Sequence, residues 1–134
     1  PDLFRRFVKV GANFMVNVTN DGFTGRTSAP YQTLAMTVFR AVENRVVVLR
    51  ASTTGVSCFI SPSGEIVERI QDNKGNDIFV SGILIRDVPL YNTKTFYARY
   101  GDVFAFAAIG VSIAALLVSI YARWRRRSGE EDPV

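Results

Sequence analysis

The side chains that could carry out nucleophilic chemistry are few. Cys58 is the one cysteine among 134 residues, and the sequence contains no histidine. A thiol attacks as its thiolate, which a neighbouring histidine or a helix N-terminus usually stabilises. Cys58 lies inside the apolar run 56–60, with neither of these next to it. We therefore predict that Cys58 is a small buried core residue and not a nucleophile.

The same composition excludes several classes of site. Without histidine the chain cannot build a Ser-His-Asp triad, a Cys-His pair or a histidine zinc site. One cysteine cannot form an intrachain disulfide or hold an iron–sulfur cluster. We therefore predict no metal site. The net charge is +4, but the basic residues before residue 103 are scattered and form no stripe with interleaved aromatics, so we predict no nucleic-acid partner.

Two further groups of polar residues could belong to a site. Asn20-Asp21-Gly22-Phe23 has the composition of a turn, and by itself a plain turn is the simpler interpretation. Arg40 and Glu43 are spaced as a helical surface ion pair, although Glu43 directly precedes an apolar run and could instead be buried and hydrogen-bonded. These residues alone indicate an α/β domain without an assigned activity.

The elements that would position these groups can be read from hydrophobic periodicity. Residue 2 opens a short helix that Gly11 ends, and Pro30 opens a longer helix with an apolar face. Strands are predicted at 14–19, 46–49, 56–60, 65–70 and 78–88. The run 46–49 is continuously apolar, which is typical of a strand buried on both faces. The order α-β-α-β-β-β-β predicts an α/β fold, α+β-like in order, that forms half of a larger sandwich.

The C-terminal part reads as a membrane anchor. Residues 103–122 contain no charge and would form a helix roughly 30 Å long, the thickness of a bilayer core. Arginines follow at 123, 125, 126 and 127, and such a cluster marks the cytoplasmic side. We predict a domain at 1–102, a transmembrane helix at 103–122 and a cytoplasmic tail at 123–134. Because the chain starts at Pro1 with a complete helix and no export signal, we also expect a fragment of a longer protein.

An ordered set of short stretches resembles the apolipoprotein N-acyltransferases, the membrane-bound branch of the nitrilase superfamily. The resemblance covers nearly the whole chain and ends in the expected last membrane helix. No single motif is decisive, but the ordered set is specific. The stretches are PDLFRRFV (1–8), GANF (11–14), TNDGFTG (19–25), SAPYQ (28–32), FRAVENR (39–45), TGVS (54–57), PSG (62–64) and TFYARYGD (95–102).

The resemblance implies the C-terminal half of a nitrilase-like αββα sandwich followed by one transmembrane helix. It implies an enzyme of the bacterial inner membrane whose domain 1–102 faces the periplasm. Such enzymes take an acyl chain from a phospholipid as a cysteine thioester and pass it to the α-amine of the diacylglyceryl-cysteine that begins an apolipoprotein. The implied partners are the phospholipid, the apolipoprotein, the membrane and the upstream portion of the same protein, with no cofactor.

The family's catalytic residues do not fall within this chain. Its general-base Glu, its oxyanion Lys and its nucleophilic Cys match positions ahead of Pro1, so the chain alone is expected to be inactive. The residues carried over are supporting ones in substrate binding: the loop Asn20, Asp21, Gly22 and Phe23, and Glu43, whose carboxylate would brace the pocket. The family commonly has Trp-Phe-Gly in the loop where this chain has Phe23-Thr24-Gly25, which keeps one aromatic ring.

Two other functions remain open at this point. A membrane-anchored amidase or nitrilase of the soluble type would use the same fold on different substrates. A stand-alone interaction module that has lost the catalytic half would need no nucleophile. The sequence does not specify acyl-chain preference, lipoprotein clients or oligomeric state.

Overall fold

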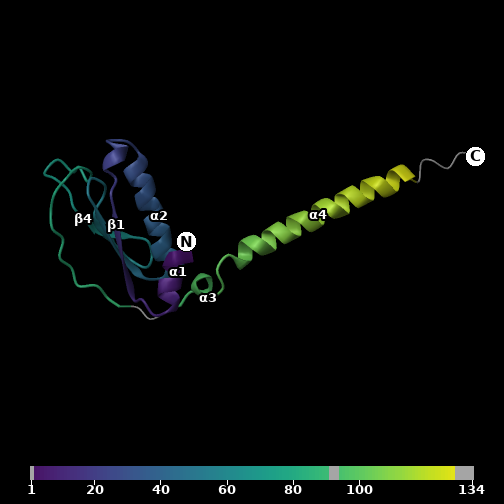
Figure 1. Cartoon of the computed structure of the whole chain (residues 1–134), viewed down its shortest axis with the longest axis horizontal. Helices are drawn as coiled ribbons and strands as arrows, with labels where there is room; N and C mark the ends of the chain where they lie inside the picture. Colours follow the sequence, from purple (N-terminus) through teal and green to yellow (C-terminus); the bar gives the residue numbers. More distant parts are fainter. Residues whose placement is uncertain (1, 91–93, 129–134) are drawn as a thin grey trace, which may run out of the picture. The chain divides into compact units, whose positions relative to one another are not determined.

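The computed structural model describes residues 2–90 and 94–128. The chain divides into two compact units with the boundary between Gly101 and Asp102. The first unit carries all of the strands found in the described residues, and the second is a long helix (Figure 1). Each unit is described by itself below.

The first unit is a four-stranded sheet with helices on one face. The strands lie in the order β1-β2-β3-β4; β1 and β2 are parallel, and the other two pairs are antiparallel. This mixed α/β architecture followed by one apolar helix confirms the predicted fold class. The elements are α1 (Asp2–Lys9), β1 (Phe14–Thr19), the 3-10 turn η1 (Gly22–Thr24), α2 (Ala29–Asn44), β2 (Val47–Ser52), β3 (Cys58–Ile60), β4 (Ile66–Arg69), α3 (Phe96–Tyr100) and α4 (Val103–Ser128).

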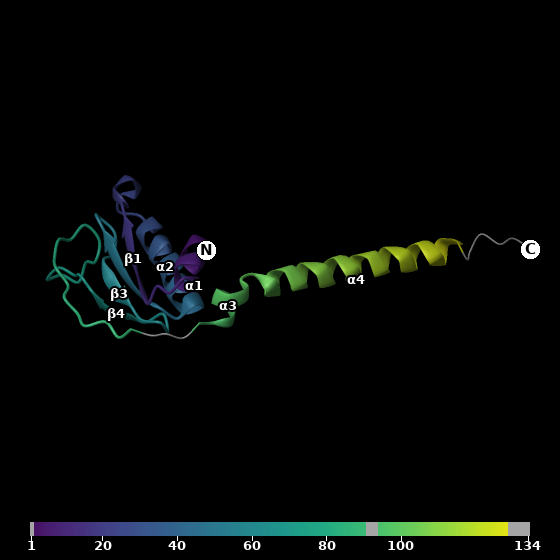
Figure 2. The ribbon, with the colours of Figure 1, turned by 60° about the horizontal axis from the view of Figure 1, so that its bottom comes forward.

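The core lies between the sheet and α2, because alternate residues of each strand point to the helical face. Val48 and Ile60 face each other across β2 and β3, and both are fully buried. They pack in one cluster with Leu34 and Ala41 of α2. Figure 2 shows α1 and α2 on this side of the sheet. The helical face therefore carries the continuous apolar core.

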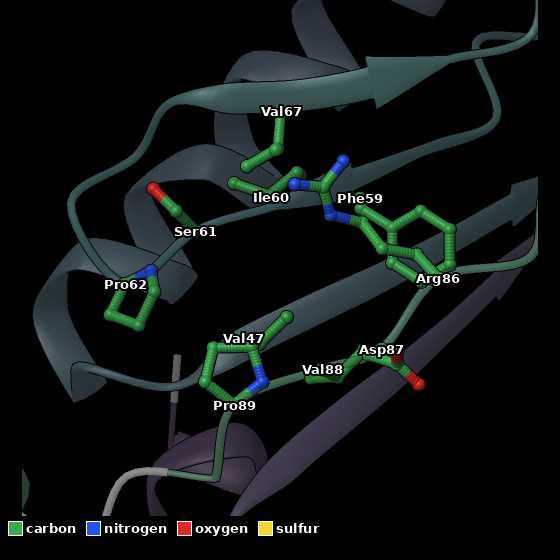
Figure 3. Close-up of a pocket in the computed structure, with 10 residues that line it drawn as sticks. All are labelled: Val47, Phe59, Ile60, Ser61, Pro62, Val67, Arg86, Asp87, Val88 and Pro89. Atoms are coloured by element: carbon green, nitrogen blue, oxygen red, sulfur yellow. The ribbon is translucent and has the colours of Figure 1, made fainter.

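The other face of the sheet is crossed by the chain that follows β4. Residues 78–88 were predicted as a last strand, and this prediction is wrong: the segment forms no ladder and runs over the sheet face instead of along an edge. Arg86 and Val88 lie above Val47 and Phe59, around a cavity of about 140 Å³ (Figure 3). Apolar and β-branched residues favour an extended segment but do not by themselves supply an edge to pair with.

Three interactions hold the beginning of this crossing segment. Asp77 is buried, accepts a hydrogen bond from the Tyr31 hydroxyl at 2.7 Å and pairs with Arg69 at 2.8 Å. The hydrogen bond to Asp77 is the main cause that raises the pKa of Tyr31. The backbone N–H of Phe79 donates to Thr54 O at 2.8 Å. The segment is therefore tied to the start of α2 and to the turn after β2.

Helix α3 was not predicted from periodicity. It packs beside Val46, at the end of the sheet where β2 begins. The Thr95 hydroxyl accepts a hydrogen bond from Ala98 N at 2.9 Å and so caps the helix. Ala98 is 1% exposed and forms a second small core with Val8 and Val46. A five-residue helix carries too little periodicity to be read from sequence, and its existence depends on this tertiary packing.

The second unit is α4, Val103–Ser128. Within it, Val103–Arg125 is long and apolar enough to cross a membrane, with a mean hydropathy of 2.6. The predicted span 103–122 lies inside this helix, and the helix continues into the arginine-rich segment.

Candidate functional site

The loop that follows β1 lies at the carboxyl end of two parallel strands. Because β1 and β2 run in the same direction, Asn20 after β1 and Thr53 after β2 lie at the same edge. Asn20 Oδ1 accepts one hydrogen bond from Thr53 Oγ1 at 2.7 Å and another from Gly22 N at 3.0 Å. The Asn20 amide therefore turns the chain and joins the two strand ends.

Asp21 faces inward from this loop and is only 2% exposed. Its Oδ2 accepts hydrogen bonds from Arg50 Nη2 at 3.0 Å and from Ser52 Oγ at 2.7 Å. Its backbone carbonyl accepts a further bond from Thr24 Oγ1 at 2.6 Å. A buried carboxylate needs such partners, because an unpaired charge costs several kcal/mol in a protein interior. Asp21 is therefore the anchor of the loop.

Arg50 supplies the opposite charge from the middle of β2 and is 4% exposed. It donates hydrogen bonds both to the sheet and to α2. This one side chain therefore connects β1, β2, α2 and the loop. Its further hydrogen bonds go to Asn17 Oδ1 at 3.0 Å, Thr33 Oγ1 at 2.8 Å, Thr37 Oγ1 at 2.8 Å and Val56 O at 3.2 Å. The guanidinium group satisfies its fixed fork of donors in this way.

Gly55, in the turn after β2, leaves room for this cluster. A Cβ at Gly55 would lie 2.1 Å from Asp21 Oδ2 and 2.7 Å from Ser52 Oγ. Both atoms belong to side chains that are already held by hydrogen bonds. Any larger residue at Gly55 would therefore displace the Asp21 carboxylate.

Phe23 points away from the cluster and is 87% exposed. It lies in η1, between the anchored Asp21 and Gly25, whose φ of +61° favours glycine. The loop therefore presents one aromatic ring to the surroundings on a backbone that is fixed from beneath.

A cleft of about 550 Å³ lies between α2 and the edge strand β1. Its lining combines polar groups with two apolar side chains, and Arg50 forms part of the wall. The lining residues are Phe4, Asn17, Thr19, Thr33, Met36, Thr37, Arg40 and Arg50. The cleft and the loop therefore share Arg50, which contacts Asp21 on one side and lines the cleft on the other.

Glu43 lies in the last turn of α2, whereas the loop precedes the first turn of that helix. The structure therefore does not bring Glu43 together with Asn20, Asp21 and Phe23. Glu43 Oε2 pairs with Arg40 Nη1 at 2.9 Å, and both side chains are partly buried. Arg40 in turn lines the cleft, so Glu43 is connected to the cleft through Arg40.

Cys58 lies in the core between the sheet and α2, and it is 3% exposed. Burial raises the pKa of its thiol to about 11, against smaller opposing effects of Arg50 and Arg69. The prediction of a buried core cysteine is confirmed. At neutral pH the thiol is protonated and shielded.

The sequence reasoning missed Arg50, which connects every part of this site. A signal was present, because a charged residue directly follows the apolar run 46–49 and continues the strand. A charge in a strand buried on both faces requires a partner of opposite sign. Asp21 was singled out only as a turn residue, and the turn composition gave no indication that its carboxylate points inward.

Comparison with known proteins agrees with this architecture. The carbon-nitrogen hydrolase family matches residues 1–97. The chain is 43% identical, over 96% of its length, to the apolipoprotein N-acyltransferase of Geobacter metallireducens. It is 38% identical over 92% to apolipoprotein N-acyltransferase 1 of Treponema denticola, and 36% identical over 90% to the apolipoprotein N-acyltransferase of Rhodopseudomonas palustris.

The chain spans less than a quarter of the length of these curated relatives, namely 23%, 22% and 22%. The similarity therefore concerns one portion of each relative. Within that portion it includes the sheet, the loop after β1 and the helices that pack on the sheet. The matched family covers most of the chain and shows its fold to be nitrilase-like, so the chain belongs to the carbon-nitrogen hydrolase family.

Proposed function

We propose that this chain is the C-terminal portion of an apolipoprotein N-acyltransferase. The observation that carries the proposal is the similarity to relatives of that name over nearly the whole chain. In the proposed reaction a cysteine thiolate attacks the ester carbonyl of a phospholipid, and the lysophospholipid leaves. The α-amine of a diacylglyceryl-cysteine then attacks the thioester, the amide forms, and the cysteine thiolate is regenerated.

The nucleophile, the base glutamate and the oxyanion lysine are proposed to lie ahead of Pro1. The geometry of the chain supports this assignment in two ways. Cys58 is buried and protonated, so it is not available for attack. Phe4 in the first helix lines the cleft beside β1, so a residue shortly before Pro1 would enter the site at the start of α1 and close to that cleft.

The contribution proposed for this chain is support and substrate contact. Arg50 and Asp21 fix the loop from beneath, and Phe23 is presented as an apolar contact for the acyl chain. Asn20 and Gly22 give the loop its turn. Glu43 holds Arg40 at the cleft wall through its ion pair. Support of this kind raises the rate by keeping reacting groups in position.

The membrane context is part of the proposal. Val103–Arg125 would cross the inner membrane, with residues 1–102 in the periplasm and the arginines after Ala122 in the cytoplasm. The phospholipid donor and the lipid-modified acceptor would then reach the site from the membrane.

The test is an assay of the longer protein that contains this chain, purified with its membrane segments. It is supplied with phosphatidylethanolamine and a synthetic diacylglyceryl-cysteine peptide, and mass spectrometry follows the peptide. We expect the peptide to gain one acyl group on its α-amine, and we expect Phe23→Ala to raise KM for the phospholipid. A protein that leaves the peptide unmodified and instead releases ammonia from amides would contradict the proposal.

The alternative supported by a specific observation is a membrane-anchored carbon-nitrogen hydrolase, because the matched family is described by that chemistry. The same assay separates the two. When a primary carboxamide is supplied as well, a hydrolase forms its thioester from that amide with release of ammonia and transfers the acyl group to water, so free carboxylic acid accumulates with or without the peptide. In the acyltransferase, product formation depends on the acceptor amine.

A further inference from the structure

Helix α3 presents two aromatic rings to the outside of the domain. Phe96 and Tyr100 are 65% and 59% exposed, and their ring centroids lie 4.7 Å apart. The opposite side of the same helix is buried through Ala98. A short helix that places its large apolar residues outward and its alanine inward is the reverse of what a water-exposed element usually shows.

The rings stand on a rigid support. The Thr95 hydroxyl donates to Glu43 O at 2.5 Å, which ties the start of α3 to the end of α2. Ala98 packs with Val8 of α1 and with Val46. Gly101 lies so close to Arg5 that a Cβ there would be 3.0 Å from the guanidinium carbon. The exposed rings are therefore fixed to the body of the domain.

Exposed basic residues lie on and next to α3. Lys94 and Arg99 flank them in sequence and are exposed. Lys9 of α1 is also exposed, and the Lys94 ammonium donates to its backbone carbonyl at 3.1 Å, which places the Lys94 side chain at the end of α1. Asp102 offsets one of these charges. Aromatic rings flanked by lysine and arginine are the combination that the headgroup layer of an anionic membrane favours.

The connection to α4 limits the distance of this surface from the membrane. Gly101 and Asp102 alone separate Tyr100 from Val103, where the apolar span begins. Consecutive Cα atoms are 3.8 Å apart, so Tyr100 lies within about 11 Å of the start of the span. The headgroup layer is roughly 6 Å thick on each side of the hydrocarbon core. Whatever the orientation of the domain, Tyr100 lies at or next to that layer.

From these observations we infer that α3 is an interfacial contact: Phe96 and Tyr100 insert into the headgroup layer of the outer leaflet, and Lys9, Lys94 and Arg99 bind its phosphates. The inference rests on the proposed function in one respect, namely that α4 spans the membrane. It adds that the domain is held against the bilayer by its own surface and not by the anchor alone. Because α3 packs on α1 and α2, this contact fixes the height of the catalytic domain above the lipid.

The test places a photo-reactive phenylalanine analogue, p-benzoylphenylalanine, at single positions of the longer protein in native membranes. The probe replaces Phe96, Ile85 or Ile113 in separate variants. Ile85 is the control: it is an apolar residue that is 90% exposed, and its neighbours Leu84 and Arg86 line cavities on the sheet face opposite α2. Ile113 lies near the middle of the apolar span and reports on the membrane anchor.

After irradiation, intact-mass and peptide analysis identify the adducts. We expect a mass increase of one phospholipid with the probe at Phe96 and at Ile113, and none with the probe at Ile85. A lipid adduct at Ile113 together with a crosslink from Phe96 to polypeptide would overturn the inference, because the rings would then contact the upstream portion or a second copy. A lipid adduct of equal yield at Ile85 would also overturn it. Absence of lipid at Ile113 would instead overturn the membrane anchor itself.

Discussion

The Asp21–Arg50 pair is the feature on which the candidate site depends at the scale of single residues. Both side chains are almost completely buried, and Arg50 also lines the cleft. Because the pair is desolvated, its value lies less in net attraction than in the penalty for separating it. The loop can therefore adopt few other positions while the pair is intact.

Removal of one charge should be far more damaging than removal of both. We expect Arg50→Met to lower stability by about 3–5 kcal/mol, because it leaves Asp21 buried without its cation. The double variant Arg50→Met with Asp21→Leu should recover part of this loss. Thermal melting of the longer protein in detergent measures both.

Arg86→Met is the matched control, since the Arg86–Glu68 pair is exposed at 44% and 41% and should be worth less than about 1 kcal/mol. A double variant that melts lower than Arg50→Met alone would show that the pair is not coupled as described.

The Cys58 thiol should be unreactive toward thiol reagents in the folded protein. With a pKa of about 11, the thiol is protonated over the whole neutral range, and its thiolate increases only as the pH approaches that value. We expect maleimide to leave Cys58 unmodified at pH 7–8 and to modify it after unfolding. Cys58→Ala should retain acyl transfer and cost about 1 kcal/mol of stability. Modification of native Cys58 at the rate of a free thiol would contradict its buried placement.

At the scale of elements, the turn after β2 is as important as the loop that it supports. Gly55→Ala should displace the Asp21 carboxylate, since the new Cβ would lie 2.1 Å from Oδ2. We expect a lower melting temperature and weaker acyl transfer. Gly110→Ala serves as control, because nothing lies within 4 Å of the added carbon. Equal melting temperatures for the two variants would mean that the turn has room to relax.

Sequence pattern predicted β1 and α2 but not the path of residues 78–88. Strand β1 was predicted at 14–19, where a run of strand-favouring residues ends at the turn Asn20-Asp21-Gly22, and the observed strand has the same bounds. Helix α2 was predicted because Pro30 and an apolar face mark it, and it starts one residue earlier than expected. Residues 78–88 have strand composition, yet Ile83 and Ile85 are 87% and 90% exposed over the sheet face. Composition favours an extended conformation for this segment, but it does not determine which strand edge or sheet face the segment follows.

The candidate site was predictable in part for a similar reason. The turn at Asn20 was visible from composition, and its hydrogen bond from Gly22 N is local, whereas its bond from Thr53 is not. The inward direction of Asp21 and the role of Arg50 depend on partners 29 residues apart in the chain. Pairing at that separation is a property of the sheet register, which local sequence does not encode.

At the scale of the whole molecule, the two ends of α4 should lie on opposite sides of the membrane. A cysteine introduced by Ser81→Cys should react with an impermeant maleimide in intact cells, whereas one introduced by Ser128→Cys should react only after permeabilisation. Both substitutions are made in a Cys58→Ala background. The asymmetry follows from the arginines that end the span. Labelling of position 128 in intact cells would contradict the assigned orientation.

The central claim is that this chain supports a catalytic thiol that it does not itself contain. The most direct measurement is to incubate the longer protein with phospholipid, trap the acyl-enzyme at low pH, digest it and locate the hydroxylamine-sensitive acyl group by mass spectrometry. We predict that the acylated cysteine lies ahead of Pro1 and that the peptide carrying Cys58 is unmodified. An acyl group on Cys58 would contradict the account, because it would make the buried strand β3 the site of catalysis.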